Sequence, residues 1–154
     1  MTLESSSEAV SEYITAVVGN QLFGLPILRV QDVFVPERLT PVPLSPPEIA
    51  GVLNLRGRIV TLIDLGRRLG IDGGKKSEQP MAIGVDCRGE SYALLVDNVG
   101  EVLKLNDNSC ESNPINLDPR IARVSAGIHR LNAQLLVVVD IDRVLDIGHK
   151  ARAA

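Results

Sequence analysis

The sequence predicts a mainly β protein in which two small five-stranded barrels arise from an internal duplication and a short C-terminal helix follows. Short apolar runs alternate with turn signals along the chain, which is typical of small barrels. The segment 51–65, GVLNLRGRIVTLIDL, recurs without a gap as 127–141, GIHRLNAQLLVVVDI. The segment 13–35 recurs less closely within 80–105. Each copy therefore supplies a hairpin, an edge strand, a connector and a second hairpin.

The composition is that of an ordinary globular domain. The chain has 154 residues, of which 45% are hydrophobic, and its formal net charge is −3. The hydrophobic content is too high for a disordered chain, and the acidic balance argues against a nucleic-acid-binding barrel. The opening MTLESSSEAVSE lacks the apolar stretch of a signal peptide, and no apolar run is long enough to span a bilayer. We therefore expect a soluble, cytoplasmic protein.

In the first copy, residues 13–35 predict a hairpin followed by an edge strand. Pro26 has no backbone N–H, which favours an edge or a bulge at that point. Apolar and polar residues then alternate, so we expect Leu28 and Val30 to face the core and Asp32 to face solvent. Such an edge either only closes the barrel or offers a surface for docking.

A second hairpin follows the connector 36–50, which contains five prolines and cannot be a regular helix. Gly57 can adopt the positive φ of a tight turn, which places Arg56 and Arg58 at the hairpin tip. The apolar strand after the tip ends at Asp64, which can cap a short helix.

The repeat predicts a single domain over residues 13–147, with interlocked subdomains near 13–72 and 80–147. A last helix is expected over about 142–147, after an aspartate that can cap it. The remaining segments are expected to be a mobile N-terminal tail at 1–12 and a frayed end at 148–154.

The two copies differ at the tip of the second hairpin. At an offset of 76 residues, Asp64 recurs as Asp140, whereas Asn132 replaces Arg56. The strand and its aspartate therefore belong to the duplicated scaffold, and the arginine does not. Two interpretations of Arg56 stay equally open: an inert surface arginine, or a charged fork that binds a carboxylate of a partner or of the other subdomain.

No group of residues predicts catalysis or cofactor binding. Phosphate-binding, dinucleotide-binding, zinc-protease and nucleophile-elbow motifs do not occur in the sequence. Cys87 and Cys110 are isolated, and the two histidines, His129 and His149, make no metal-ligand spacing. We expect free thiols, a structural His129, no metal and no cofactor.

Asp64 and Asp140 each end a β-branched strand, where a phosphoacceptor or metal ligand can lie. Helix capping is the favoured interpretation, because the two aspartates lie in separate copies and need not converge. Arg67 and Arg68 are interpreted as a solvated helix face.

Taken together, GVLNLRGRIVTLIDL and LPILRVQDVF resemble the CheW family of bacterial chemotaxis coupling proteins, and the resemblance extends over residues 13–147. It implies two five-stranded SH3-like β-barrels packed around a shared core and no enzyme activity. It further implies a scaffold that couples transmembrane chemoreceptors to the histidine kinase CheA. The adaptor of another chemosensory array, such as one for twitching motility, is the alternative.

The resemblance also implies the partners and their sites. The regulatory domain of CheA is itself CheW-like, and the cytoplasmic tips of chemoreceptors dock in the groove between subdomains. The resemblance implies a protein that works at membrane-associated receptor arrays without inserting in the membrane. We also expect that it binds no nucleic acid and is monomeric when free. The partner-binding or contact-supporting positions carried over by this resemblance are Val30, Asp32, Gly51, Asn54 and Arg56.

Two positions depart from the family pattern. Thr61 stands where the family often has proline, and it restores a backbone donor to its strand. Asp32 stands where glutamate is usual, so it carries the same charge on a shorter side chain.

Overall fold

The computed structural model describes residues 9–71 and 79–146. Its strands are β1 (Val10–Val18), β2 (Gln21–Pro26), β3 (Val30–Phe34), β4 (Ile49–Leu55), β5 (Arg58–Asp64), β6 (Met81–Cys87), β7 (Glu90–Val96), β8 (Asn98–Asn106), β9 (Ser125–Leu131) and β10 (Gln134–Val139). Its short helices are η1 (Ile27–Arg29), α2 (Leu65–Leu69), η2 (Asp107–Ser109), α3 (Pro119–Ala122) and α4 (Ile141–Val144).

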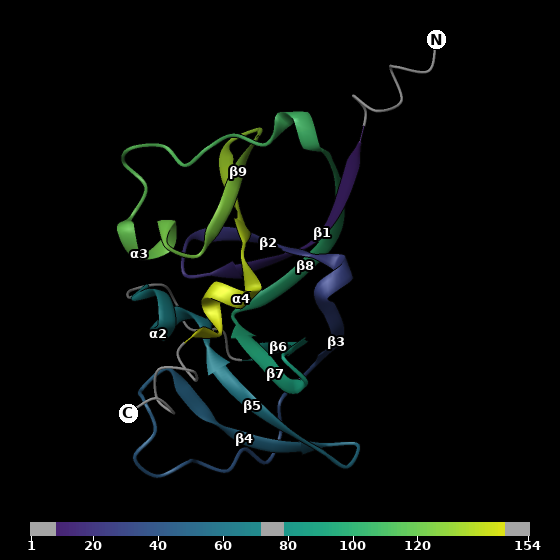
Figure 1. Cartoon of the computed structure of the whole chain (residues 1–154), viewed down its shortest axis with the longest axis vertical. Coiled ribbons are helices and arrows are strands. Elements are labelled where there is room, and N and C mark those ends of the chain that lie inside the picture. Colours follow the sequence, from purple (N-terminus) through teal and green to yellow (C-terminus); the bar gives the residue numbers. More distant parts are fainter. Residues whose placement is uncertain (1–8, 72–78, 147–154) are drawn as a thin grey trace.

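The strands form two five-stranded sheets, which confirms the mainly β fold. Sheet A has the order β8-β1-β2-β10-β9 and makes the upper lobe of Figure 1. Sheet B has the order β3-β6-β7-β5-β4 and makes the lower lobe. Within the described residues no pairing joins the two edge strands of either sheet, so each barrel is open along one seam.

The two copies of the repeat exchange strands. Sheet A combines β1 and β2 of the first copy with β8, β9 and β10 of the second. Sheet B combines β6 and β7 of the second copy with β3, β4 and β5 of the first. In each sheet one parallel pairing joins the copies, β2 with β10 and β5 with β7. Each sheet therefore needs strands from both halves of the chain.

One apolar core lies between the sheets and holds them together. Phe23 and Leu25 enter it from sheet A, and Ile83 and Leu94 enter it from sheet B; all four are fully buried. Burial of each such side chain stabilises the fold by about 1.5–3 kcal/mol. The shared core therefore makes the two lobes one unit.

Each sheet also has a small core of its own. In sheet B this core consists of Leu53, Val60, Leu62, Ala82 and Ala93. Its counterpart in sheet A contains Tyr13, Leu136 and Val138.

The position of Leu28, where the chain passes between the lobes, differs from the expected one. Leu28 does not face the core: it lies in η1 and is 93% exposed. β2 ends at Pro26, and the chain crosses from sheet A to sheet B in a 3₁₀ turn, so the strand pattern restarts at Val30. Val30 then pairs with Val85 and packs, partly buried, against the shared core.

The first strand and the last helix both begin earlier than the sequence predicts. β1 begins at Val10, three residues earlier than expected, because Val10 pairs with Asn106 of β8. The last helix begins at Ile141, after its N-cap Asp140, and residues 147–154 lie outside the described residues. Over residues 9–71 and 79–146, no helix has the length and apolar character needed to cross a membrane.

Candidate partner-binding site

The tip of the β4–β5 hairpin reaches across sheet B to β3. Arg56 and Gly57 both have positive φ, 53° and 82°, as a two-residue hairpin turn of type I′ requires. The Asn54 side-chain oxygen accepts a hydrogen bond from the Gly57 N–H at 2.9 Å and holds the turn. Arg56 Nη1 then lies 3.3 Å from Asp32 Oδ2. Because β3 and β4 are the two edges of sheet B, this ion pair spans the open seam.

A pocket of about 210 Å³ lies beside this pair. A second ion pair at its wall joins Arg58 to Asp86, with 3.8 Å between nitrogen and oxygen. The side chains of Arg56 and Arg58 are 80% and 62% exposed, so both guanidinium groups remain accessible to a partner. The other lining residues are Gln31, Asp32, Phe34, Leu55, Val60, Gly84, Val85, Ser91 and Tyr92.

The structure therefore brings together three of the five candidate residues, namely Asp32, Asn54 and Arg56. Val30 packs toward the core. Gly51 is buried and has a φ of 151°, and a Cβ there would lie 2.6 Å from the Thr40 carbonyl oxygen.

Gly51 lets the proline-rich connector lie against β4, where Thr40 and Val52 exchange two backbone hydrogen bonds of 2.8 Å. Gly127 repeats the arrangement in sheet A: its φ is 138°, and a Cβ there would lie 3.1 Å from the Glu111 carbonyl oxygen. Gly51 therefore shapes the scaffold that carries the site.

The ion pair at the seam is special to sheet B. In sheet A, Glu101 takes the place of Asp32, and Asn132 takes the place of Arg56. An asparagine carries no charge, so the second copy cannot form the equivalent pair.

A second surface was not found from the sequence. A groove of about 660 Å³ runs between the connector and β5, and it includes Leu44 and Ile59. Leu44 is fully exposed and has a φ of 64°, within a turn in which the Ser45 N–H donates to the Val42 carbonyl. Glycine is the usual residue at such a turn position. An exposed leucine held in a strained conformation, beside the 64% exposed Ile59, is typical of a docking surface.

The two aspartates at the strand ends act as helix caps. Asp64 Oδ1 accepts a hydrogen bond from the Arg67 N–H at 3.2 Å, and Asp140 Oδ1 accepts one from the Arg143 N–H at 3.3 Å. Each arginine side chain also bonds, at 3.4 Å, to a carbonyl of the preceding connector. The repeat has therefore preserved a complete capping arrangement, as the capping interpretation predicted.

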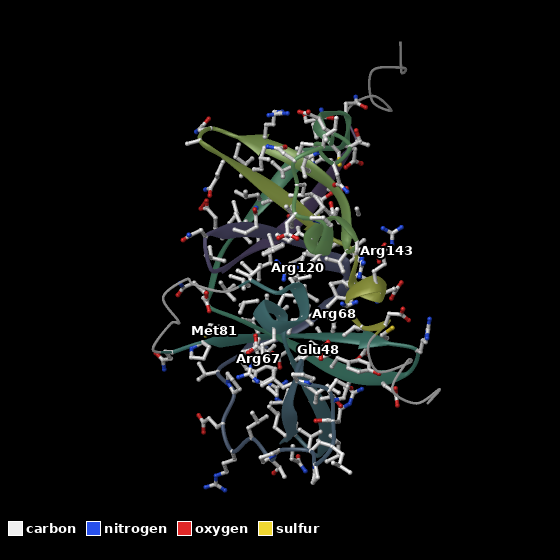
Figure 2. All side chains as sticks on the ribbon, turned by 90° about the vertical axis from the view of Figure 1, so that its left-hand side faces the viewer. Glu48, Arg67, Arg68, Met81, Arg120 and Arg143 are labelled. Carbon is white, nitrogen blue, oxygen red and sulfur yellow. The ribbon has the colours of Figure 1, made fainter. Side chains whose placement is uncertain are left out.

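Arg67 and Arg68 are more than a solvated helix face. Figure 2 shows both, with Arg143, at the waist between the lobes. Arg68 donates 3.0 Å hydrogen bonds to the carbonyl oxygens of Val144 and Arg143, so α2 is tied to the end of α4. The sequence interpretation was wrong for Arg68, because the two helices approach only in the folded chain, whereas the Arg67 side chain is 59% exposed.

The described residues contain no cluster of three His, Cys, Asp or Glu side chains that could hold a metal ion. Cys87 and Cys110 are free thiols, and burial is the largest of the influences that raise the pKa of Cys87. The features described above, an exposed ion pair beside a pocket and an apolar groove, are those of contact surfaces.

Comparison with known proteins identifies the family of this chain. The sequence pattern of the CheW-like domain matches residues 12–148. The chain belongs to this family. Chemotaxis protein CheW of Klebsiella aerogenes is 29% identical to it over 134 residues, which cover 87% of this chain and 81% of that protein.

A solved structure of the CheW family has the same fold. The scaffolding protein TtCheW from Thermoanaerobacter tengcongensis matches with a TM-score of 0.78 and 30% identity, over 85% of this chain and 84% of that chain. A segment of chemotaxis protein CheA of Salmonella typhimurium is also similar, with 24% identity over 95% of this chain and 21% of that protein. The predicted family, fold class and non-catalytic role are confirmed: the chain is a chemotaxis adaptor of the CheW family.

Proposed function

We propose that this adaptor couples transmembrane chemoreceptors to the histidine kinase CheA, in the cytoplasm at membrane-associated receptor arrays. The ion pair at the seam of sheet B is the observation that supports a contact site there. Its arginine is absent from the second copy, yet it remains 80% exposed while paired with Asp32. A permanently charged, planar group in that position can exchange its internal carboxylate for one on a partner.

The similarity of CheA to almost the whole of this chain supports the kinase as a partner. A CheW-like segment of the kinase and the adaptor can then meet barrel to barrel, with the receptor held by the same scaffold. Receptor state acts on the kinase through the free-energy difference between two arrangements of the complex. The adaptor of a different chemosensory array stays the alternative, and the kinase that binds this chain distinguishes the two.

A co-sedimentation assay tests this proposal. The chain is mixed with the CheW-like segment of its cognate kinase and, separately, with the cytoplasmic fragment of a receptor. We expect Arg56→Ala to weaken retention of at least one partner. Arg130→Ala is the matched control, since Arg130 is also an exposed arginine paired with a carboxylate, but it lies in sheet A.

Leu44→Ser tests the groove on sheet B in the same assay. Loss of one partner with Arg56→Ala and of the other with Leu44→Ser assigns one partner to each surface. Normal binding of both partners by both variants would exclude these surfaces as contact sites. Failure of the wild-type chain to bind either partner would refute the proposed function.

A further inference from the structure

The small core of sheet A holds a titratable side chain at a position where sheet B holds leucine. At the offset of the repeat, His129 on β9 corresponds to Leu53 on β4. Their neighbours also correspond: Leu136 takes the place of Val60, and Tyr13 takes the place of Ala82. The two lobes can therefore be compared directly: at the same position of the repeated scaffold, sheet B has the apolar Leu53 and sheet A has the imidazole of His129.

His129 is 1% exposed, and its Nε2 atom has no hydrogen-bond partner. Its ring lies against Tyr13, with 5.8 Å between ring centroids and 55° between planes. Gly24 makes room for this packing, since a Cβ there would lie 2.8 Å from Leu136 and 3.3 Å from Tyr13. The surroundings are closely packed and mainly apolar, which favours the neutral imidazole.

Two nearby carboxylates influence the pKa of His129 through their charge. Asp107 approaches from η2, and Glu111 approaches from the connector that pairs with β9. Both already have partners: Asp107 accepts a 2.6 Å hydrogen bond from the Ser11 hydroxyl, and Glu111 accepts hydrogen bonds of 3.1 Å from Arg130.

Burial and the nearby carboxylates act in opposite directions on the pKa of the imidazole. Burial lowers the pKa of His129, and Asp107 and Glu111 oppose this effect without reversing it. Tyr13 is itself held neutral, because burial raises the pKa of its hydroxyl, an effect to which Asp107 and Cys110 add.

We propose that His129 makes sheet A an acid-sensitive half of the protein: protonation of the imidazole opens the packing between β9 and β1, while sheet B, with Leu53 in its place, stays closed. A protonated Nε2 becomes a donor with no acceptor in the core. Among the described residues no acceptor lies within hydrogen-bond distance of Nε2, so a protonated ring reaches Asp107 or Glu111 only if that carboxylate side chain moves or β9 moves away from Tyr13.

The direction of the pH effect follows from proton linkage. The unfolded or opened state titrates near pH 6.5, and the closed state binds its proton only at lower pH. Between these values the opened state holds more protons, so the closed state loses stability as the pH falls. Each pH unit below about 6.5 favours opening by at most about tenfold.

Acid-dependent opening of sheet A would be a regulatory property in addition to the scaffold role. The connector lies on β9 through two hydrogen bonds between Glu111 and Ile128, of 2.8 and 2.9 Å, so opening of β9 also releases the connector from the sheet. An acidified cytoplasm would then loosen one lobe of the adaptor and leave the other intact.

Hydrogen exchange of the isolated wild-type chain at pH 7.5 and 5.5, corrected for intrinsic rates, tests the inference without any partner. We expect protection of amides in 125–139 to fall by up to about tenfold at the lower pH, and protection in 49–64 to change much less. His129→Leu, which copies the first repeat, and the polar but non-titrating His129→Gln are each expected to remove the difference.

Equal loss of protection in both sheets would overturn the inference, as would an unchanged pH effect in either variant that folds. If both variants fail to fold, the difference in protection between sheet A and sheet B of the wild-type chain still tests the inference. An NMR titration gives a second readout: the imidazole signal lost in the variants should titrate below the ordinary histidine range, and titration within that range would contradict the proposal.

Discussion

Arg56 and Asp32 are joined by a 3.3 Å ion pair that links the two edges of sheet B. Both residues were candidates from the sequence, but no pattern in the sequence showed that they touch. Neither alternative left open by the sequence included a carboxylate of the arginine's own lobe, and the paired Arg56 side chain stays 80% exposed to a partner.

The first prediction concerns this pair. Arg56→Ala and Asp32→Asn should each change the free energy of unfolding by no more than about 1 kcal/mol, because exposed ion pairs contribute little. If the pair contacts a partner, each change should weaken binding by about 2 kcal/mol or more. A double-mutant cycle, read by urea unfolding and by partner titration, separates the two effects.

Additive losses of binding in that cycle would contradict the view that the pair acts as a unit. Val30→Ala is a poorer probe than the sequence suggested. Val30 packs against the shared core, so its truncation should cost about 1–2 kcal/mol of stability before any partner is added.

The second prediction concerns Gly51. Gly51→Ala should destabilise the fold by more than about 2 kcal/mol, because the new methyl group would meet the Thr40 carbonyl at 2.6 Å. Gly57→Ala is the matched control: its φ of 82° is also unfavourable for alanine, but nothing lies within 4 Å of the new Cβ. Its cost should be about 1–2 kcal/mol. Thermal unfolding measures both, and equal effects would show that steric contact at Gly51 is unimportant.

The third prediction separates capping from phosphotransfer. Asp64→Ala and Asp140→Ala should each cost about 0.5–2 kcal/mol of stability, because each removes the side chain that caps a helix. Incubation of the wild-type chain with small phosphodonors should add no mass. A stable increase of roughly 80 Da on either aspartate would instead identify a phosphoacceptor.

The fourth prediction concerns the pH dependence of the stability contributed by the ion pair between Arg29 and Asp142, at the waist between the lobes. Arg29 donates a 2.9 Å hydrogen bond to Asp142, and this bond is the main cause of the lowered pKa of Asp142. The bridge therefore stabilises the fold above the ordinary aspartate range, and its contribution disappears as the pH falls through the lowered pKa.

Because the side chain of Asp142 is 60% exposed, the contribution should be at most about 1 kcal/mol. Urea unfolding of wild type and Asp142→Asn should differ at neutral pH and converge in strong acid. A constant difference across the whole range would show that the bridge does not account for the effect.

The fifth prediction follows from the strand exchange. If the chain is cut within 72–78, each fragment lacks two or three strands of every sheet it enters. The separate fragments should therefore show no cooperative unfolding, and mixing them should restore it. Independent folding of either fragment, seen as a cooperative thermal transition, would contradict this interdependence.

Most of the fold was predictable because its signals are local. The turn at Arg56-Gly57 and the cap at Asp64 depend on residues within one hairpin or one helical turn, and short-range patterns report them well. Duplication strengthened the assignment of the cap, since Asp140 repeats Asp64 in the same context. Leu28 was placed wrongly because alternation cannot show where a strand ends and a chain crosses between sheets.

The composition of the site required the tertiary structure. Leu44 was missed because a φ of 64° is a property of the folded backbone, and Arg68 was misinterpreted because α4 lies far away in the sequence. His129 was rightly expected to be structural, but its unpartnered Nε2 depends on the packing of β1 and β9.

By itself, the sequence determined that this chain is a duplicated β protein of the CheW family whose distinctive residue is Arg56. Only the tertiary structure decided that the copies exchange strands, and that Arg56 reaches Asp32 across an open seam. The physical reason is that hydrophobic periodicity specifies which face of a strand is buried, whereas the choice of neighbouring strand depends on long-range packing. Contacts between distant charged side chains follow from that choice.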